Sequence, residues 1–494
     1  MFEKITPEAA GIRSDAIARI IERINKRNIP IHSLLMMRGD KIFGEFYWEP
    51  YHKDYPHRMY SATKSYTALA IGLLADDGKL SLDDKIAELF TEKIHSELSP
   101  FIDGLTVREM LTMSTTGNGP SWFTLDDPDR TSVYFNNKKT DPHPSGTVWQ
   151  YDSAGSQVLA ALVDKLAGKP LFDFLRERIF DKLGTFKNAS MLRTRNGDSW
   201  GDSALLATAR DGASVARLLM QGGRWNGEQL ISEAFVKEAI SPLVSISDTP
   251  WGQAVRHGYG YQIWHTERGG FAFNGMGSQL TIGLPSDDII FAVNADTQGP
   301  LDRVHKELIV TMLFDMLEDY TGEALPADAE GAARLAKASE SLKLFAVRGM
   351  ADSPFRTELD GVTYHCRENA LGFTEFTFSF KDATAGSLRY TNGSGEKVIP
   401  FRVNENEFGN FPELGYSQDL GGTRTTDGST YRDAVSLAWV EERKIVLHIQ
   451  IIDRYLGSAT LVFGFKGGYA TVQATKAGEN FLGGYEGIIV ASQE

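Results

Sequence analysis

The chain is nearly free of cysteine. Cys366 is the only one among 494 residues. A single thiol cannot form an intrachain disulfide, which excludes the disulfide-stabilised scaffolds of small secreted domains. Because Cys366 lies in a stretch rich in strand-forming residues, we expect a buried packing residue there rather than a catalytic thiol.

Long apolar runs are also missing. No segment reaches the 18 consecutive apolar residues that a membrane-spanning helix requires. The first residues include an early acid, Glu3, and lack the basic start and apolar run of a secretory signal. We therefore expect a soluble, cytoplasmic protein that makes no membrane contact.

Basic charge and metal-binding patterns are scarce as well. The formal net charge of −14 leaves no basic face for nucleic acid. The ten histidines form neither a His-x-His-x-Asp-His cluster nor a His-Glu-x-x-His helix, so we expect no metal and no organic cofactor. Gly-x-Ser-x-Gly and phosphate-loop motifs are absent too.

The composition that remains is that of a globular enzyme, with 42% hydrophobic and 23% charged residues. A chain of 494 residues exceeds what one core usually supports, so we expect more than one domain. Alanine, glutamate and proline accumulate between residues 323 and 341, as in a linker. We place the first domain at 1–325, a linker or helix at 326–345 and a second domain at 346–494.

Periodicity predicts the elements of the first domain. Isoleucines with helical spacing predict a helix over 14–28 that Ser14 caps. Two strands, 32–37 and 41–48, flank Arg38-Gly39-Asp40, which we interpret as a hairpin turn rather than an adhesion motif. A mostly buried helix is predicted over 61–77.

Later segments are richer in strands. Runs 258–264 and 279–293, joined through the glycine-rich stretch 269–277, are predicted to be neighbouring antiparallel strands. Beyond the linker the pattern is almost wholly β and favours a small antiparallel barrel or sandwich. Its predicted strands are 373–380, 387–390, 398–403, 436–440, 445–452 and 459–465.

The first motif with catalytic residues is Ser61-Ala62-Thr63-Lys64, at the start of the predicted buried helix. Residues three apart share a helix face, so the lysine amine can stand beside the serine hydroxyl. A partly desolvated lysine can act as the base that a serine nucleophile needs. The helix N-terminus adds backbone N–H groups where an oxyanion would form. His57 lies close before Ser61, and we expect a polar loop histidine there rather than a catalytic base.

The sequence around this motif resembles that of the class C β-lactamase-like serine hydrolases. The resemblance rests on residues 59–65 (Met-Tyr-Ser-Ala-Thr-Lys-Ser), on the helix exit at 73–84 and on residues 105–117. At 113–117 this chain has Met-Ser-Thr-Thr-Gly where the family commonly has His-Thr-Ser-Gly. Residues 6–320 are covered by the resemblance.

A second motif supports the same family. Residues 146–155 resemble the segment that carries the family's Tyr-x-Asn motif. The resemblance makes Tyr151 the phenol that relays a proton to the leaving group and activates the deacylating water. Ser153 replaces the usual asparagine and cannot offer an amide, although its hydroxyl can still bond Lys64.

The third motif departs most from the family. Residues 273–279 (Phe-Asn-Gly-Met-Gly-Ser-Gln) stand where relatives have Lys or His, then Thr or Ser, then Gly. Gly275 and Gly277 permit close approach of a substrate. Met276 N–H is our expected second oxyanion donor, with Ser278 as the alternative register. The missing cation favours esters or neutral amides over penicillins.

Together the motifs imply an α/β (α+β) β-lactamase-like catalytic domain with a helical subdomain and a C-terminal all-β antiparallel barrel. That barrel resembles the lipocalin-like modules of some relatives and could cap the pocket or mediate homo-oligomerisation. The implied activity is cleavage of a small-molecule ester, amide, D-amino-acid peptide or β-lactam through an acyl-enzyme. The alternative is a catalytically silent ligand-binding or regulatory protein. Burial of Lys64 against Ser61 would favour the enzyme.

Overall fold

A computed structural model describes residues 2–117, 119, 127–246, 257–415, 428–478, 482 and 485–493. The chain divides into two compact units. Of the described residues, those in 2–297 and 301–343 form the N-terminal unit, and 298–300 with those from 344 on form the C-terminal unit. Within the described ranges, no helix has both the length and the apolar character needed to cross a membrane.

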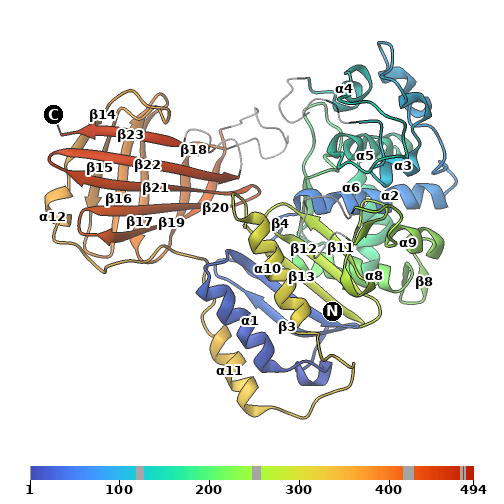
Figure 1. Ribbon diagram of the computed structural model, residues 1–494, viewed down its shortest axis with the longest axis horizontal. Helices are drawn as coiled ribbons and strands as arrows, with labels where there is room; N and C mark the ends of the chain where they lie inside the picture. The colour runs from blue at the N-terminus through green and yellow to red at the C-terminus, as the bar shows by residue number, and fades with distance from the viewer. Residues whose placement is uncertain are drawn as a thin grey trace. The chain divides into compact units, whose positions relative to one another are not determined.

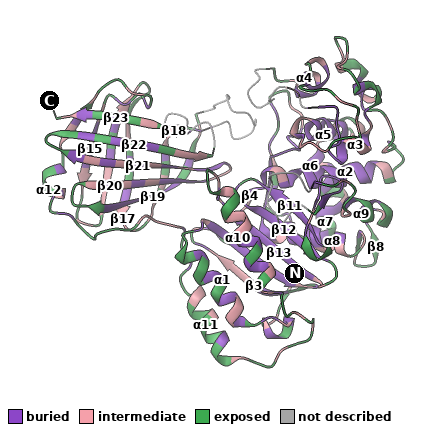
Figure 2. Ribbon diagram, in the orientation of Figure 1, coloured by how far each residue is buried: buried purple, intermediate pink, exposed green. Residues whose placement is uncertain are grey.

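An eight-stranded sheet forms the centre of the N-terminal unit (Figure 1). Most of its strands are buried, as the purple ribbons of Figure 2 show. The strands lie in the order β1 (Glu3–Lys4), β3 (Lys41–Tyr47), β2 (Ile31–Arg38), β13 (Ile289–Ala295), β12 (Gln279–Leu284), β11 (Phe271–Gly275), β10 (Trp264–His265) and β9 (Gly258–Tyr259).

Helices cover both faces of this sheet. The helices of the whole unit are α1 (Ser14–Lys26), α2 (Thr63–Asp76), α3 (Val107–Leu111), α4 (Arg130–Asn136), α5 (Ser153–Ala167), α6 (Leu171–Leu175), α7 (Asp181–Leu183), α8 (Ala209–Met220), α9 (Glu233–Ala239), α10 (Asp302–Asp315) and α11 (Ala329–Ser339), of which several pack on other helices rather than on the sheet. One apolar cluster joins α1 and α10 to the sheet, and another joins α2, α5, α6 and α8. Short strands complete the unit: β4 (His57–Arg58), β5 (Ser190–Met191), β6 (Leu205–Ala207), β7 (Arg224–Trp225) and β8 (Glu228–Gln229).

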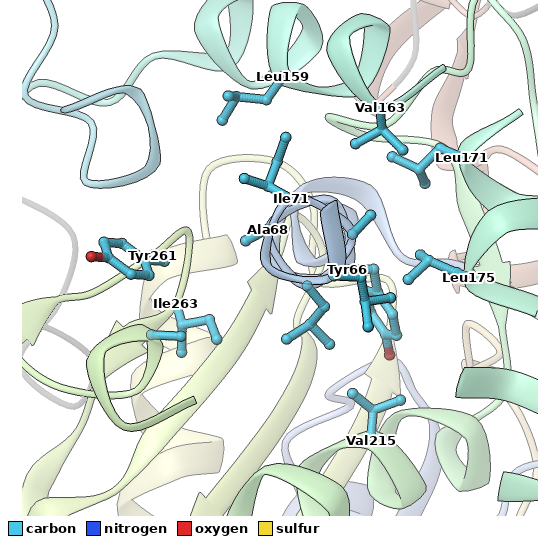
Figure 3. Close-up of a cluster of buried hydrophobic side chains, with 14 of the residues drawn as sticks. Tyr66, Ala68, Ile71, Leu159, Val163, Leu171, Leu175, Val215, Tyr261 and Ile263 are labelled. Carbon is cyan, nitrogen blue, oxygen red and sulfur yellow. The ribbon is translucent and has the colours of Figure 1, made fainter. Parts of the chain in front are cut away.

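Helix α2 is the most deeply buried helix near the candidate site. Figure 3 shows it nearly end-on, with apolar side chains from several elements around it. Leu159 of α5 and Val215 of α8 approach from opposite sides, and Leu171 and Leu175 of α6 approach from a third. A helix enclosed by apolar side chains resists displacement, so the residues at its N-terminus are held in place.

The predicted N-terminal elements are confirmed, with one correction. Helix α1 and the hairpin of β2 and β3 occur where expected, and Gly39 adopts a φ of +55° in the turn. Ser14, however, does not cap α1. Arg13 holds the cap position, and the buried Glu8 carboxylate accepts hydrogen bonds from the Ser14 N–H (2.7 Å) and hydroxyl (3.0 Å).

Two strand predictions later in this unit are wrong in detail. Run 258–264 contains two short strands, β9 and β10, which pair with each other. Run 279–293 is also two strands, β12 and β13, separated by a turn. The glycine-rich stretch is not a connection, because β11 occupies residues 271–275 within it and pairs with β12.

Helix α11 lies in the region predicted to be a linker or helix, and it packs beside α1 (Figure 1). The Arg334 guanidinium contacts the carboxylates of Asp15 and Glu22 at 2.6 Å each. Leu335 and Ala338 pack against the apolar cluster beneath α1. Helix α11 is therefore a packed part of the N-terminal unit.

The C-terminal unit is the expected antiparallel barrel. Its strands are β14 (Thr363–Cys366), β15 (Glu375–Phe380), β16 (Ala385–Asn392), β17 (Gly395–Val403), β18 (Glu407–Leu414), β19 (Thr430–Glu441), β20 (Lys444–Ile452), β21 (Leu456–Lys466), β22 (Tyr469–Gly478) and β23 (Gly487–Ser492). A parallel pairing closes the ring, with Arg402 of β17 opposite Ser436 of β19. A short helix, α12 (Arg356–Leu359), precedes the first strand.

Aromatic side chains fill the interior of the barrel. Phe376, Phe378 and Phe463 are fully buried, and their ring centroids lie 4.9–6.2 Å apart. Trp439 stacks on Phe380 near them. The sole cysteine, Cys366, is half-buried rather than buried, because it lies at the end of β14. Burial raises the pKa of its thiol to about 11, which disfavours the reactive thiolate.

Candidate active site

Ser61 stands in a tight turn immediately before α2. The turn is a 3-10 helix, Tyr60–Ala62, that leads directly into α2. Tyr60 has a φ of +45°, a left-handed conformation that non-glycine residues rarely adopt. Such strain persists only where the surrounding structure enforces it, and here the Met59 N–H is tied to the Leu205 carbonyl at 2.8 Å. Ser61 is thus held half-buried at the N-terminus of a buried helix.

Lys64 points at Ser61 from the first turn of α2. Its Nζ donates a hydrogen bond of 3.1 Å to Ser61 Oγ and one of 2.8 Å to the main-chain carbonyl of Asp202. The side chain is only 1% exposed. A lysine this buried costs free energy unless a function or a charge partner compensates. The structure therefore brings the first two candidate residues together in the expected geometry.

Tyr151 lies on the other side of Lys64. The centre of its ring is 5.2 Å from Lys64 Nζ, and it stacks on Trp264 with centroids 6.0 Å apart. Asp152, which follows, caps α5 by accepting a hydrogen bond from the Gly155 N–H at 2.8 Å. Ser153 is the half-buried first residue of α5. The hydrogen bonds of Lys64 go to Ser61 and Asp202, so Ser153 does not take over the lysine contact.

The third motif lies beside the Ser61 turn, at the end of β11. A Cβ added to Gly275 would lie 2.2 Å from the carbonyl oxygen of Met59 and 3.2 Å from the Ala62 nitrogen. Strand β11 thus lies directly against the turn that holds Ser61. Met276 follows β11 directly and is 42% exposed.

Hydrogen bonds from buried side chains hold the tip of the hairpin beyond Met276. Gly277 and Ser278 have φ values of +72° and +66°. Ser278 is fully buried, and its hydroxyl lies 2.7 Å from the Thr297 hydroxyl, which donates to Asp302 at 2.6 Å. In this conformation the Ser278 side chain supports the hairpin, while Met276 lies at its exposed edge.

A cation near the third motif was not foreseen from the sequence. Lys306 of α10 donates a hydrogen bond of 3.2 Å to the Gly275 carbonyl. Burial lowers the pKa of Lys306, although Asp302 and Glu307 act in the opposite direction. Helical spacing alone could not identify Lys306, because the loop after β13 determines which residue of α10 reaches β11.

Gln262 is a second residue that the sequence did not single out. It is buried with a φ of +56°, and its amide donates to the Met110 carbonyl at 2.9 Å. Its side-chain oxygen accepts from Ser156 at 2.7 Å, and its main-chain oxygen accepts from Ser65 at 2.7 Å. Gln262 therefore ties together α2, α3 and α5, the helices that carry or support Lys64 and Tyr151.

His57 differs from expectation. It lies on β4, only 2% exposed, and not in a polar loop. One of its ring nitrogens hydrogen-bonds His32 at 3.0 Å, and Tyr51 stacks on His32 with centroids 3.9 Å apart. Burial lowers the pKa of His57 to about 3 and that of His32 well below 6.5. Two neutral, buried imidazoles form a structural pair rather than a base for Ser61.

This pair should make folding sensitive to acid. The unfolded chain protonates each histidine near pH 6.5, whereas the folded protein keeps His57 neutral down to about pH 3. Stability is therefore fully present above pH 6.5 and falls as the pH drops, by about 1.4 kcal/mol per pH unit for each histidine. Urea unfolding of wild type and of the double variant His32→Gln, His57→Gln at several pH values would measure this contribution. Parallel pH dependence in the two proteins would contradict it.

Among the described residues, no group of three or more metal-ligating side chains occurs. The site thus consists of a serine, a buried lysine, a tyrosine and the close-approaching end of β11. Comparison with protein families identifies the family of the chain. A family model described as Beta-lactamase matches residues 17–313. The chain belongs to the beta-lactamase family.

Relatives agree with this membership. A 6-aminohexanoate-dimer hydrolase of Paenarthrobacter ureafaciens is 25% identical over 316 residues, covering 59% of this chain and 79% of that protein. A solved structure of a Bacillus anthracis protein assigned to the same hydrolases has a TM-score of 0.52 at 20% identity and covers 66% of this chain and 89% of its own. A penicillin-binding protein homologue from Caulobacter crescentus has a TM-score of 0.50 at 17% identity, covering 62% and 98%. At these identities the two structures support the fold alone.

Proposed function

We propose that this beta-lactamase family member is a serine hydrolase that forms an acyl-enzyme on Ser61. The observation that carries the proposal is the 3.1 Å hydrogen bond from the buried Lys64 amine to Ser61 Oγ. A serine hydroxyl becomes a nucleophile when an adjacent base removes its proton. The strained turn at Tyr60 adds support, because backbone strain of this kind gathers at functional sites.

The geometry supports a two-step reaction. Ser61 Oγ attacks the substrate carbonyl carbon while its proton passes to Lys64. The N–H groups of Ser61 and Met276 stabilise the oxyanion, because helix and strand meet at the turn. Tyr151 with Lys64 returns the proton to the leaving group, and water then releases the acyl group from Ser61.

For the substrate we propose a small ester or amide. The absence of a lysine or histidine from the third motif favours uncharged substrates. Lys306 donates to the carbonyl of Gly275, but it is largely buried and already lies 3.9 Å from the Asp302 carboxylate, so it does not replace the missing cation. An amide linkage, of the kind named for the Paenarthrobacter ureafaciens relative, fits the preference for an uncharged substrate.

The test is covalent labelling of Ser61. We expect wild type to gain the mass of one fluorophosphonate adduct and to hydrolyse p-nitrophenyl acetate, and Ser61→Ala to do neither. Ser65→Ala is the matched control, because Ser65 lies one turn along the same helix and its hydroxyl is bonded to the Gln262 carbonyl instead. Intact-protein mass spectrometry and absorbance report the two results. A folded wild type that shows neither would reject the enzyme and favour a silent ligand-binding protein.

A further inference from the structure

A buried carboxylate stands behind the candidate base. Asp202 is completely buried, and its Oδ2 lies 3.8 Å from Lys64 Nζ. The same residue accepts the 2.8 Å hydrogen bond from Lys64 through its main-chain oxygen. Asp202 therefore contacts the lysine at two points, although the two residues are 138 positions apart in the chain.

The charges around this pair come from separate elements. Arg58 of β4 and Arg130 of α4 both lie over the Trp200 ring, at 4.6 and 5.7 Å from its centre, and both act electrostatically on Asp202. Tyr151 faces Lys64 from α5's side, and Ser61 completes the surroundings. The cluster thus consists of Lys64, two arginines and one carboxyl group, and all four of these side chains are buried.

Such a cluster has a definite consequence for proton transfer. Burial raises the pKa of Asp202, and the nearby Lys64, Arg130 and Arg58 act in the opposite direction. The Asp202 carboxylate lies 3.8 Å from Lys64 Nζ, close enough for its charge to act directly on the amine, and the two guanidinium groups counteract that charge at Asp202.

We propose that Asp202 is a positioning residue for the reaction at Ser61. Its main-chain oxygen and its carboxylate hold Lys64 Nζ against Ser61 Oγ, and the carboxylate charge acts on the amine that accepts the serine proton. The proton balance is simple, because the proton leaves Ser61 Oγ, resides on Lys64 during acylation and goes to the leaving group. This role rests on the proposed acyl-enzyme function and adds to it a residue outside the three motifs.

The test is the pH dependence of kcat/KM in Asp202→Asn. Asparagine keeps the main-chain hydrogen bond and nearly the same volume but removes the negative charge. We expect the acid limb of the profile to move to lower pH by about one unit or more, with a lower plateau from poorer positioning. Arg130→Gln removes a cation and should move the acid limb the opposite way, to higher pH. Loss of packing alone cannot produce displacements of opposite sign.

Asp211→Asn is the matched control. Asp211 is a buried carboxylate that caps α8 through Thr208 and has no contact with Lys64. We expect this variant to lose stability and to keep the wild-type acid limb. Rates are normalised to the fraction of Ser61 that a fluorophosphonate labels. Unchanged acid limbs in both Asp202→Asn and Arg130→Gln would overturn the proposal, and the arginine variant decides alone if Asp202→Asn does not fold.

A second measurement separates this proposal from the proposed function. In protein labelled with ¹³C-lysine, the Lys64 Cε resonance is identified by its absence from Lys64→Met. We expect its change with pH to occur at lower pH in Asp202→Asn than in wild type. The same change in both proteins would overturn the role of Asp202. This readout needs no turnover, so it holds even if wild type fails to react at Ser61.

Discussion

Lys64→Met is expected to lower kcat/KM for p-nitrophenyl acetate by about 10³- to 10⁴-fold. Methionine has nearly the length of lysine and suits a buried site, so the packing around α2 is retained. The amine that reaches Ser61 Oγ at 3.1 Å is removed, and in the described site no other basic side chain hydrogen-bonds that oxygen. Without a base the serine hydroxyl is a poor nucleophile. Steady-state kinetics with the purified variant measure the effect.

The control for this variant is Lys182→Met. Lys182 is a half-exposed lysine whose amine pairs with Glu228 at 2.9 Å, and its loss should leave the kinetics within about twofold of wild type. Circular dichroism checks that both variants are folded, because removing Lys64 leaves Asp202 buried beside two arginines only. If Lys64→Met retained more than about a tenth of wild-type kcat/KM, Lys64 would not be the general base.

Gly275→Ala is expected to reduce acylation of Ser61 by about 10²-fold or more. The new Cβ would lie 2.2 Å from the Met59 carbonyl oxygen, which is far inside van der Waals contact. The new Cβ is fixed to the backbone of Gly275, and the Met59 oxygen is a backbone atom, so this clash can be relieved only if β11 or the Ser61 turn moves. Either movement separates the Ser61 and Met276 N–H groups that we assign to the oxyanion. Stopped-flow measurement of p-nitrophenol release reports the acylation rate directly.

Gly464→Ala in β21 is the matched control, because nothing lies within 4 Å of the added Cβ. This variant tests whether replacing a strand glycine has a general cost. We expect it to acylate at the wild-type rate. Wild-type acylation in Gly275→Ala as well would mean that β11 does not contribute to the site.

The parts of the site that the sequence could predict are those whose partners lie close along the chain. Ser61 and Lys64 are one helical turn apart, so their contact follows from helix geometry. Asp202, Gln262 and Lys306 could not be predicted. Each reaches the site from a distant part of the sequence: Asp202 contacts Lys64 over 138 residues, and Gln262 contacts Ser65 over 197. The spacing of apolar residues along the sequence does not indicate such a contact.

The strand errors have a related cause. Alternation over 258–264 indicated one strand, but Gln262 turns its main chain to bond the Leu111 carbonyl and thereby ends the pairing. Glycines over 269–277 indicated a connection, yet strand β11 needs a glycine at 275 to approach the Ser61 turn. His57 is buried where a polar loop was expected, because His32 from β2 packs on it together with the nearby rings of Tyr51 and Tyr55. In each case tertiary contacts outweigh local pattern.

The barrel was predictable because alternation continues over its longer strands, although β14, β18, β22 and β23 were missed. The phenyl and indole rings inside the barrel determine which of its surfaces can contact other molecules. Buried aromatic side chains occupy the interior of the described strands, so the outer wall of the barrel is the surface on which other molecules can bind. Outward-facing positions such as Val398, Tyr469 and Ile488 are where this module can diversify without disturbing its own core.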